Sequence, residues 1–495
     1  MIEGVPVCIC HRLLKSLCSL AGAFLLLSVV GCAQNPVTGL SDFVMLSEEN
    51  ELNIGRTSHP KIIEKYGRYK DEALQNYVQA IGEGLVRVSH RQGLIYRFTV
   101  LDSAVINAFA LPGGYIYITR GLMAYLNSEA ELAAVLGHEI GHVTARHGIR
   151  QQSAAQVVDI GYTIGSILLP ELKAAGPQNL FNTLSGALLS GYGREHELES
   201  DGLGAEYLAR SGYDPEAMLD VIGILKNQSS FAKAQAKHQG LEPQGYHGVF
   251  ASHPDNDTRL KNVVSTANQY IVQNGKVKRD DYLDRINGMT FGDSENQGIR
   301  SGEYFYHIEM GFSVKFPKEW QINNKQESLE SMAAGGKAFI QMRVEDLNRH
   351  IPPLQFIQDR LGINKIKGNK TLSFNGLKGY TGVTEKKGKR ARVSVVYLDE
   401  KAFVFIGRAK DNQLFNQFDV FFLEIAGSLQ RLKENEFRLA KAKKIGIKTV
   451  TKIDNYQVWS KSSRISNSPL MQLRLLNADY PSGELRIGQR AKFIQ

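Results

Sequence analysis

The residues with the clearest chemical meaning are two histidines four positions apart, His138 and His142, with Glu139 directly after the first. On an α-helix, positions i and i+4 lie on one face about one turn apart, so both imidazoles can reach one metal ion. Glu139 points about 100° around the helix from His138, where it can hold a water molecule instead of binding the metal. The spacing therefore predicts a zinc hydrolase site, provided that the segment is helical.

The flanking residues predict that helix. Ser128 and Glu131 have the spacing of a capping box, and apolar residues follow on one helix face: Leu132, Val135, Leu136, Ile140 and Val143. Only Gly137 and Gly141 lower the helix propensity, by about 1 kcal/mol each relative to alanine, and both allow another backbone to approach closely. We therefore expect one unbroken helix from about residue 130 to residue 147.

A catalytic zinc site needs a third protein ligand. The metzincin pattern is excluded, because the two positions that it requires to be Gly and His hold Ala145 and Gly148. A second expected helix, beginning near residue 194, offers Glu197, with Asp201 four residues later on the same face. Glu197 would complete a set of two histidines and one carboxylate that leaves a position for water, while Asp201 accepts a hydrogen bond from a ligand imidazole.

Other titratable residues are predicted to be structural. Glu195 and Glu199 lie on the far side of the second helix from Glu197. The remaining histidines outside the motif have no partner at ligand spacing, and a lone histidine is more often a surface or satisfied core residue: His11, His59, His90, His147, His196, His238, His247, His307 and His350. For His147, the negative end of the helix dipole is a sufficient reason for its position.

Several blocks in succession resemble the zinc metallopeptidases that include HtpX, the CAAX prenyl endoprotease and BepA. The blocks are residues 107–119, the motif at 138–142, residues 194–201 and the Gly-Tyr-Asp-Pro sequence at 212–215. The resemblance extends from about Asn35 to Arg259, and the soluble BepA-like branch, a group of gluzincin-type envelope lipoproteins, fits best.

This resemblance implies a set of site residues. One zinc ion per chain would be bound by His138, His142 and Glu197. Glu139 would act as the general base, and Asp201 would support a ligand from outside the coordination sphere.

The resemblance also implies how substrate and access are handled. The strand around Gly113, Gly114 and Tyr115 would be the edge with which an extended substrate pairs; a plain core strand is the alternative. His253, in a Ser-His-Pro block, would occupy the open zinc position and hold the enzyme latent; a solvent-facing histidine before a proline-initiated helix is the alternative.

The first part of the chain is typical of an exported protein. Residues 17–31 form an apolar run behind two cationic residues, which is the length and flank of a signal peptide and is short for a membrane span. The Val-Val-Gly sequence before Cys32 resembles a lipobox, so residues 1–31 are predicted to be a bacterial lipoprotein signal and Cys32 the acylated residue. No cysteine follows Cys32, so the mature chain forms no internal disulfide. We expect a lipid-anchored envelope protein that faces the periplasm, at the outer membrane because Ala33 is not Asp; an uncleaved anchor is the alternative.

A chain of 495 residues favours about three domains. We expect a mainly α, zincin-type metallopeptidase domain with a small sheet at 32–275 and a linker at 276–300. An α+β sandwich similar to PsbP/Mog1-type domains is expected at 301–435, because alternating strands precede an apolar helix at about 413–432. The last module, 436–495, is a small α/β unit similar to part of a LysM module, although the Gly-Asp-Thr opening of a glycan-binding LysM is missing.

Charge is distributed unevenly over these parts. Residues 32–270 carry a net charge of −6, residues 271–495 carry +14, and the whole chain carries +9. The basic half favours contact with an anionic envelope surface or peptidoglycan, and a solvated basic face is the alternative. Nucleic acid is not expected as a partner because of the export signal.

Taken together, these patterns predict a zinc-dependent endopeptidase of the bacterial envelope that acts on misfolded or unassembled proteins. Self-inhibition by His253 is part of this prediction. The alternative is a non-catalytic assembly chaperone or surface-binding adaptor that works through the basic C-terminal half.

Overall fold

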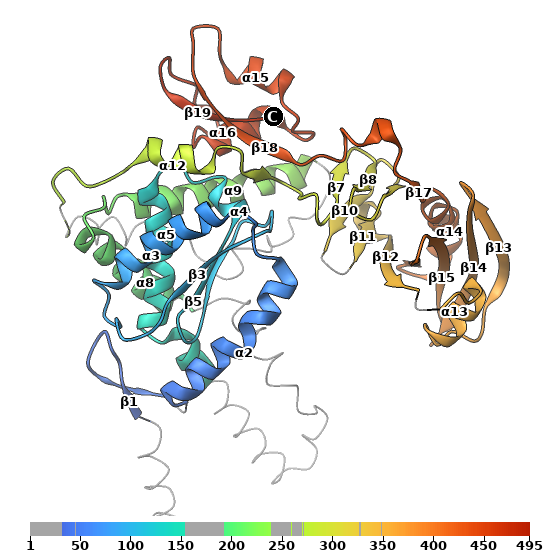
Figure 1. Ribbon diagram of the computed structural model, residues 1–495, viewed down its shortest axis with the longest axis horizontal. Coiled ribbons are helices and arrows are strands. Elements are labelled where there is room, and N and C mark those ends of the chain that lie inside the picture. Colours follow the sequence, from blue (N-terminus) through green and yellow to red (C-terminus); the bar gives the residue numbers. More distant parts are fainter. Residues whose placement is uncertain are drawn as a thin grey trace, which may run out of the picture.

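The computed structural model of the chain describes residues 32–44, 46–153, 193–238, 259, 270, 272–325, 328–347 and 349–495. The predicted signal at residues 1–31 and the predicted gate His253 lie outside these residues. Figure 1 shows a helical body around a small sheet, a β-rich body to its right, and the C-terminal strands above the helices. Within the described residues, no helix combines the length and the apolar character that crossing a membrane requires. The chain is thus multidomain, with helices and several sheets.

The helical body is built on a three-stranded sheet of order β3-β5-β4, made by β3 (Arg97–Leu101), β4 (Ala108–Leu111) and β5 (Tyr115–Thr119). Strand β5 pairs in parallel with β3 and antiparallel with β4. Gly113 and Gly114 form the turn between β4 and β5 with φ of 81° and 86°, a conformation that favours glycine. The prediction that the segment from Gly113 to Tyr115 opens an edge strand is therefore wrong: β5 is central and is paired on both sides, and the edge strand next to it is β4.

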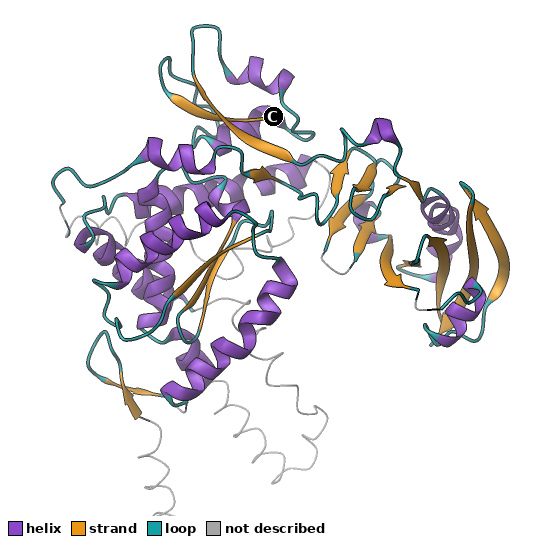
Figure 2. Cartoon of the chain, in the orientation of Figure 1, coloured by secondary structure: helices purple, strands orange, loops and turns teal. Residues whose placement is uncertain are grey.

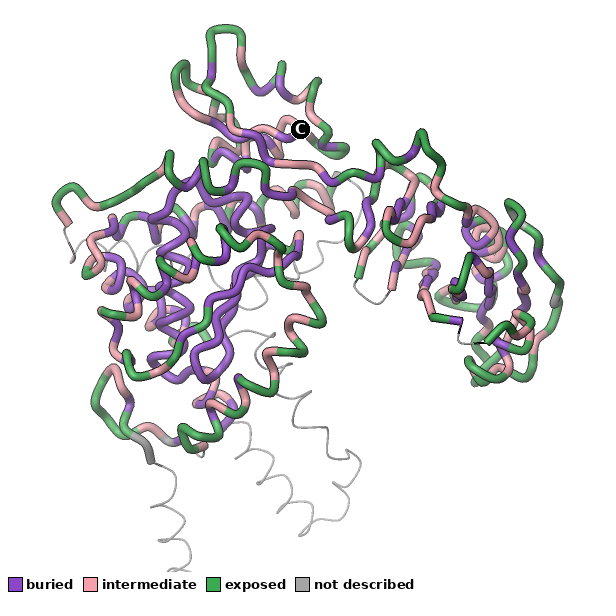
Figure 3. The backbone as a smooth tube through the Cα atoms, viewed as in Figure 1, coloured by how far each residue is buried: buried purple, intermediate pink, exposed green. Residues whose placement is uncertain are grey.

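Helices cover both faces of this sheet. On one face, α2 (Glu48–Tyr66) packs Ile62, Ile63 and Tyr66 against the aromatic residues of β4 and β5. The other face carries α3 (Glu72–Val86) and α5 (Glu129–Thr144), with the short α4 (Arg120–Met123) between β5 and α5. Helices α8 (Arg194–Arg210) and α9 (Ala217–His238) pack on α5. Every residue of α5 is buried, so this helix is the centre of the body (Figures 2 and 3).

The start of α5 agrees with the predicted capping pattern, and its end does not agree with the predicted length. Ser128 accepts a hydrogen bond from the Glu131 amide at 3.1 Å, but the Glu131 carboxylate accepts from the amide of Asn127, one residue before the cap. The helix ends at Thr144, and Arg146 adopts a φ of 55° before the backbone becomes helical again at His147. This left-handed residue breaks the expected single helix and re-directs everything that follows it.

The β-rich body contains two sheets. A four-stranded sheet has the order β17-β9-β8-β7, from β7 (Ile299–Ser301), β8 (Tyr304–His307), β9 (Phe312–Lys315) and β17 (Gln430–Arg431). A seven-stranded sheet has the order β10-β11-β12-β16-β15-β14-β13. Its strands are β10 (Gln321–Asn324), β11 (Leu329–Met332), β12 (Ala338–Asp346), β13 (Lys367–Phe374), β14 (Leu377–Lys386), β15 (Lys389–Leu398) and β16 (Lys401–Ala409).

Two helices cover the seven-stranded sheet. Helix α14 (Asn412–Gly427) buries Phe415, Phe422 and Ile425 on one face, and α13 (Pro353–Asp359) buries Phe356 and Ile357 on the other. The apolar helix expected to reach residue 432 ends at Gly427 instead, because residues 430 and 431 pair with β9 as β17.

The C-terminal module packs directly on the helical body. It contains β18 (Lys443–Thr449), α15 (Tyr456–Ser462), α16 (Pro469–Leu476) and β19 (Arg490–Ile494), and β18 also pairs with β6 (Thr290–Phe291). Its apolar residues belong to the same core cluster as those of α3, α5 and α9. The segment 276–300, expected as a linker, contains α12 (Arg279–Ile286) and β6, and the Arg120 guanidinium donates to the carbonyls of Thr290 and Gly292. The domain limits stay a proposal.

Candidate metal centre

Three glycines set the distance between the two helices that carry the candidate ligands. A Cβ atom on Gly141 of α5 would lie 3.0 Å from the Cα of Ser200 on α8, and one on Gly204 of α8 would lie 3.1 Å from the amide nitrogen of His138. A Cβ atom on Gly137 would lie 3.4 Å from the Cα of Gly204. The backbones of α5 and α8 are therefore nearly in contact, as the glycines of the motif led us to expect, and short side chains can meet across the crossing.

His138, His142 and Glu197 meet at this crossing, and all three are buried. The Nε2 atoms of the two histidines are 3.0 Å apart, and the Glu197 oxygens lie 3.6 Å from His138 Nε2 and 3.4 Å from His142 Nε2. A tetrahedral zinc ion with ligand distances near 2.05 Å holds its donor atoms about 3.4 Å apart. The spacing of the three donors therefore fits a zinc ion.

Hydrogen bonds to the opposite ring nitrogen determine which nitrogen of each histidine is free to bind metal. His138 Nδ1 lies 2.8 Å from the carboxylate of Asp201, which can only accept, so this nitrogen carries the proton. The Nε2 atom of His138 is then left with a lone pair that points at the other ligands. Asp201 thus takes the supporting position that the sequence predicted for it.

A longer chain of bonds orients His142. Its Nδ1 lies 2.8 Å from Nδ1 of His147, whose Nε2 lies 2.9 Å from the carboxylate of Glu199. The carboxylate can only accept a hydrogen bond, so His147 Nε2 carries the proton. His147 Nδ1 then accepts a hydrogen bond from His142 Nδ1, and His142 Nε2 keeps its lone pair. Burial lowers the pKa of His142 well below its usual value and also lowers the pKa of His147, in keeping with neutral rings.

These tautomers make the centre a cluster of acceptors. Two imidazole lone pairs and the Glu197 carboxylate converge in a buried space without a proton between the two Nε2 atoms, an arrangement that a cation stabilises. A buried set of two histidines and one glutamate on an HExxH helix and its neighbour defines the class of zinc metallopeptidases.

Arg259 neutralises the acidic side of the centre. Its guanidinium donates two hydrogen bonds of 2.7 Å to the Asp201 carboxylate and lies 3.2 Å from an oxygen of Glu197. Burial alone would raise the pKa of Asp201, but Arg259 and His138 together hold it below its usual value. Asp201 is therefore a carboxylate in this structure and an acceptor for the ligand His138.

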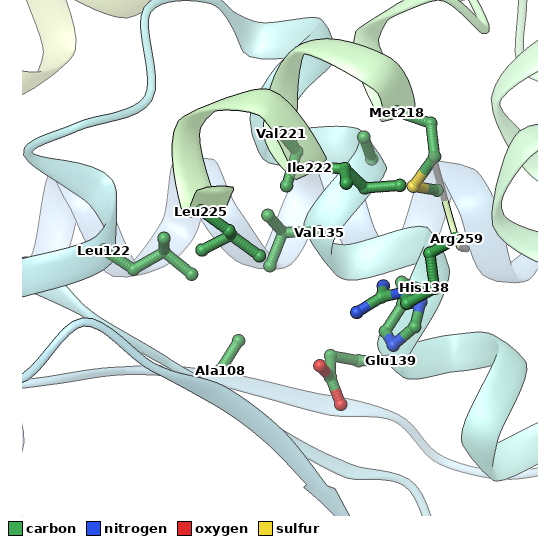
Figure 4. Close-up of a pocket in the computed structure, with 11 residues that line it drawn as sticks. Ala108, Leu122, Val135, His138, Glu139, Met218, Val221, Ile222, Leu225 and Arg259 are labelled. Atoms are coloured by element: carbon green, nitrogen blue, oxygen red, sulfur yellow. The ribbon is translucent and has the colours of Figure 1, made fainter. Parts of the chain in front are cut away.

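Glu139 lies beside the three candidate ligands but points into a separate pocket (Figure 4). This pocket is a small cavity of about 30 Å³ that is partly open to solvent. Glu139, His138 and Arg259 lie at one end, and the rest of the lining is apolar, from β4, α4, α5 and α9: Ala108, Leu122, Ala134, Val135, Met218, Val221, Ile222 and Leu225.

Two residues that the structure places at the centre, His147 and Arg259, were not predicted to act there. His147 was expected to be structural, because its spacing from His142 matches no motif; the left-handed Arg146 turns it under His142. The contact of Arg259 with Asp201 was not predicted, since nothing in the local sequence connects the two residues.

Cys32 begins β1 (Cys32–Gln34), which pairs with β2 (Ser41–Phe43), and its acylation stays a prediction. The gate role of His253 also stays a prediction.

Comparison with known proteins agrees with the class that the site defines. Residues 72–267 match the profile of peptidase family M48. These residues thus form a peptidase family M48 domain, which confirms the resemblance to zinc metallopeptidases, and zinc is the cofactor of this domain.

Two relatives show how far the similarity extends. The chain is 33% identical over 278 residues to a beta-barrel assembly-enhancing protease of Yersinia pestis, which covers 53% of each chain. It is 32% identical over 149 residues to the mitochondrial metalloendopeptidase OMA1 of Arabidopsis thaliana, which covers 29% of each chain. The chain therefore spans about half the length of the first of these relatives. A cyanobacterial PsbP from Synechocystis covers 28% of this chain at 11% identity and a TM-score of 0.22, so the PsbP/Mog1-like assignment stays a prediction.

Replacing His147 by Leu is expected to weaken zinc binding about 10–100-fold, because His142 loses the partner that holds its ring and its tautomer. Competition with a fluorescent zinc chelator measures this affinity. His59→Leu is the matched control, since His59 contacts Tyr117 on the far face of the sheet and should leave the affinity unchanged. Equal zinc affinities for His147→Leu and the wild type would contradict the assigned role.

Proposed function

We propose that this chain is a zinc-dependent endopeptidase of the bacterial envelope that cleaves misfolded or unassembled proteins. The observation that carries the proposal is the convergence of His138, His142 and Glu197 next to Glu139, at the mouth of an apolar pocket. The peptidase family M48 domain that contains these residues supports the same reading.

In the proposed mechanism, His138, His142 and Glu197 would hold the zinc ion, whose chemistry when bound would be that of a Lewis acid toward the peptide carbonyl and water. Glu139 takes the proton from the attacking water and delivers it to the leaving amine. Asp201 and His147 keep the two imidazoles in the orientation and tautomer that binding requires.

Strand β4 is the proposed platform for the peptide. Ala108 at one end lines the pocket of Glu139, while Ala110 and Leu111 at the other end line a small cavity with His142. Within the described part of the chain, β5 is the one strand that pairs with β4, and an extended peptide would pair along the other edge of β4. Backbone pairing of this kind binds unfolded segments with little regard to sequence, which suits misfolded substrates.

The envelope location rests on the lipoprotein-like signal and on the relatives. The Yersinia pestis relative is named a beta-barrel assembly-enhancing protease, and we extend an envelope role to this chain as a proposal. Attachment through an acylated Cys32 and latency through His253 belong to the same proposal. Contact of the basic C-terminal half with an anionic envelope surface or peptidoglycan is also part of this proposal.

Removal of zinc is the direct test of the proposed activity. A chelator is expected to abolish cleavage of an unfolded protein such as casein by the purified chain, and one equivalent of zinc should restore it, because the three donors are the proposed metal site. Cleavage that persists after zinc has been removed would overturn the proposal. Metal analysis of the treated protein serves as the control that zinc has left.

The apolar pocket predicts a substrate preference. Val221→Trp is expected to fill the pocket and lower kcat/KM for peptides with Leu or Phe beside the scissile bond by about 10–200-fold relative to peptides with Ala there. A set of quenched-fluorescence peptides that differ at one position measures the ratio. Lys226→Trp, on the exposed side of α9, is the control and should leave the ratio unchanged. An unaltered ratio in Val221→Trp would exclude the pocket as the recognition site.

A further inference from the structure

One end of the seven-stranded sheet carries a group of exposed cations, which we call the basic rim. The rim lies where β12 begins, β14 and β15 meet in a hairpin, and β16 ends. Its members are Lys337, Lys386, Lys387, Lys389, Arg408 and Lys410. All six are exposed, and none forms an ion pair with any residue that the structure describes.

Strand register and loop contacts make the rim continuous. Lys386 and Lys389 are directly opposite each other across the β14–β15 hairpin. The Asn412 amide donates to the Gly388 carbonyl at 2.9 Å, which holds the hairpin against the loop after β16. In that loop, the Lys410 amide donates to the Lys337 carbonyl at 2.9 Å. The six cations therefore lie along one edge of the β-rich body.

The opposite end of the same sheet has a different pattern. There Lys401 pairs with Asp346, Lys325 with Glu330, and Arg431 with Asp399, at 2.5–2.8 Å. At the basic rim, the neighbouring acids have other positions or partners: Asp411 accepts two backbone amides at the start of α14, and Glu385 is opposite Arg390. The cations of the basic rim thus differ from these three, each of which has a carboxylate partner.

The rim does not contribute to folding in an obvious way. Like charges directly opposite each other on paired strands are destabilising, and this applies to Lys386 and Lys389. Lys387 has a φ of 51°, in the turn position where Asn or Gly is preferred. Three lysines at this tip therefore cost stability without an intramolecular partner, which points to a partner outside the chain.

We propose that the basic rim is a docking surface for an anionic phospholipid bilayer. Five of the six residues are lysines, whose hydrated point charges on flexible stems suit a diffuse layer of headgroups rather than a shaped anion site. They project from a hairpin and two loops, a geometry that allows several of them to reach a plane. The rim belongs to a different body from the zinc centre, so the proposal stands or falls independently of peptidase activity.

Vesicle co-sedimentation tests the proposal on the predicted mature chain, residues 32–495, with Cys32→Ser, so that neither the apolar run at 17–31 nor an acyl chain contributes. The chain with an unchanged basic rim is expected to bind vesicles that contain about one third phosphatidylglycerol. It should dissociate from them in about 1 M NaCl, where the screening length is about 3 Å. The triple variant Lys386→Gln, Lys387→Gln, Lys389→Gln should partition about a hundredfold more weakly. A second variant, with Lys337, Arg408 and Lys410 changed to Gln, should lose a similar amount.

The matched control removes three cations from the opposite end of the sheet by changing Lys325, Lys401 and Arg431 to Gln. It changes the net charge equally and should bind as the wild-type rim does, within about threefold, because paired cations contribute little to the external field. Equal losses in the control and the rim variants would overturn the proposal, as would equal binding of the wild type to pure phosphatidylcholine vesicles. If the chain binds an acidic protein but does not bind these vesicles, the proposal is overturned as well. Thermal unfolding of each variant shows whether the exposed changes have left the fold intact.

Discussion

Glu139→Gln is expected to lower kcat for peptide cleavage about 10²–10⁴-fold while the protein keeps its zinc. The amide is nearly the same size as the carboxylate, but it cannot take a proton from the attacking water. Glu139 is buried beside His138 and is not one of the three converging donors, so the metal site should survive the change. Casein and peptide cleavage measure the loss, and metal analysis measures the zinc.

Two controls make this result specific. Glu195→Gln changes an exposed glutamate on α8, two residues before Glu197, and it should retain most of the activity. His142→Ala should lose both zinc and activity, since it removes a donor atom. A pure Glu139→Gln protein that cleaves peptides at the wild-type rate would rule out the proposed mechanism. If a strain with Glu139→Gln behaves like the wild type in the cell, the non-catalytic chaperone becomes the better reading.

Lys492→Met is expected to destabilise the peptidase core by about 3 kcal/mol. Lys492 lies on β19, is completely buried, and donates hydrogen bonds to the carbonyls of Ala124 at 2.8 Å and Leu126 at 2.7 Å. These carbonyls belong to the turn that leads into α5, and the Glu131 carboxyl is close to the ammonium group. Without the lysine, two buried carbonyls lose their donor and Glu131 loses its counter-charge. Urea unfolding followed through zinc release measures the change.

The pH dependence of the Lys492→Met variant provides a second signature. Burial raises the pKa of Glu131 to about 7, although Lys492 moderates the shift. A carboxyl with a raised pKa contributes stability below its unfolded value of about 4.5, and this contribution is lost as the pH rises through the folded value. The deficit of Lys492→Met relative to the wild type should therefore grow as the pH rises through about 7.

Two further variants decide whether the buried contact is the cause. Adding Glu131→Gln should restore part of the lost stability, because no buried carboxylate then remains without a cation. Lys452→Met, an exposed change in the same module, should stay within about 0.5 kcal/mol of the wild type. If Lys492→Met unfolds at the wild-type urea concentration, the C-terminal module does not support the zinc helix in this way.

The site residues that the sequence proposes depend on helix geometry for their placement. The i and i+4 spacing of His138 and His142, and of Glu197 and Asp201, places each pair on one face of its helix, whatever the helix later packs against. The cap at Ser128 is equally local, as its bond to the Glu131 amide shows. Regular periodicity over many residues also indicated the helix α14. The helix was expected to reach residue 432, but it ends at Gly427, and residues 430 and 431 form β17.

The errors concern contacts that no local pattern contains. The strand around Gly113 to Tyr115 was predicted at an edge, but β5 lies in the middle of its sheet because it has a parallel partner, β3, from an earlier part of the chain. The apolar residues of the segment 436–495, which was expected as a C-terminal module, belong to the core of the helical body. Such pairings depend on which surfaces remain to be buried once the helices have formed, and this is decided by packing over the whole fold.

The sequence by itself determined the chemistry of this protein: a helix with two imidazoles and a carboxylate, a second helix with two more carboxylates, and a split in charge between its halves. Only the tertiary structure decided how that chemistry is held. The left-handed conformation of Arg146 places His147 next to His142. Arg259 forms hydrogen bonds with Asp201 and neutralises its charge. Lys492 on the last strand donates to the turn before α5. Each of these contacts joins groups that are distant in sequence or lie across a break in the helix, so its energy becomes available only when the chain has folded.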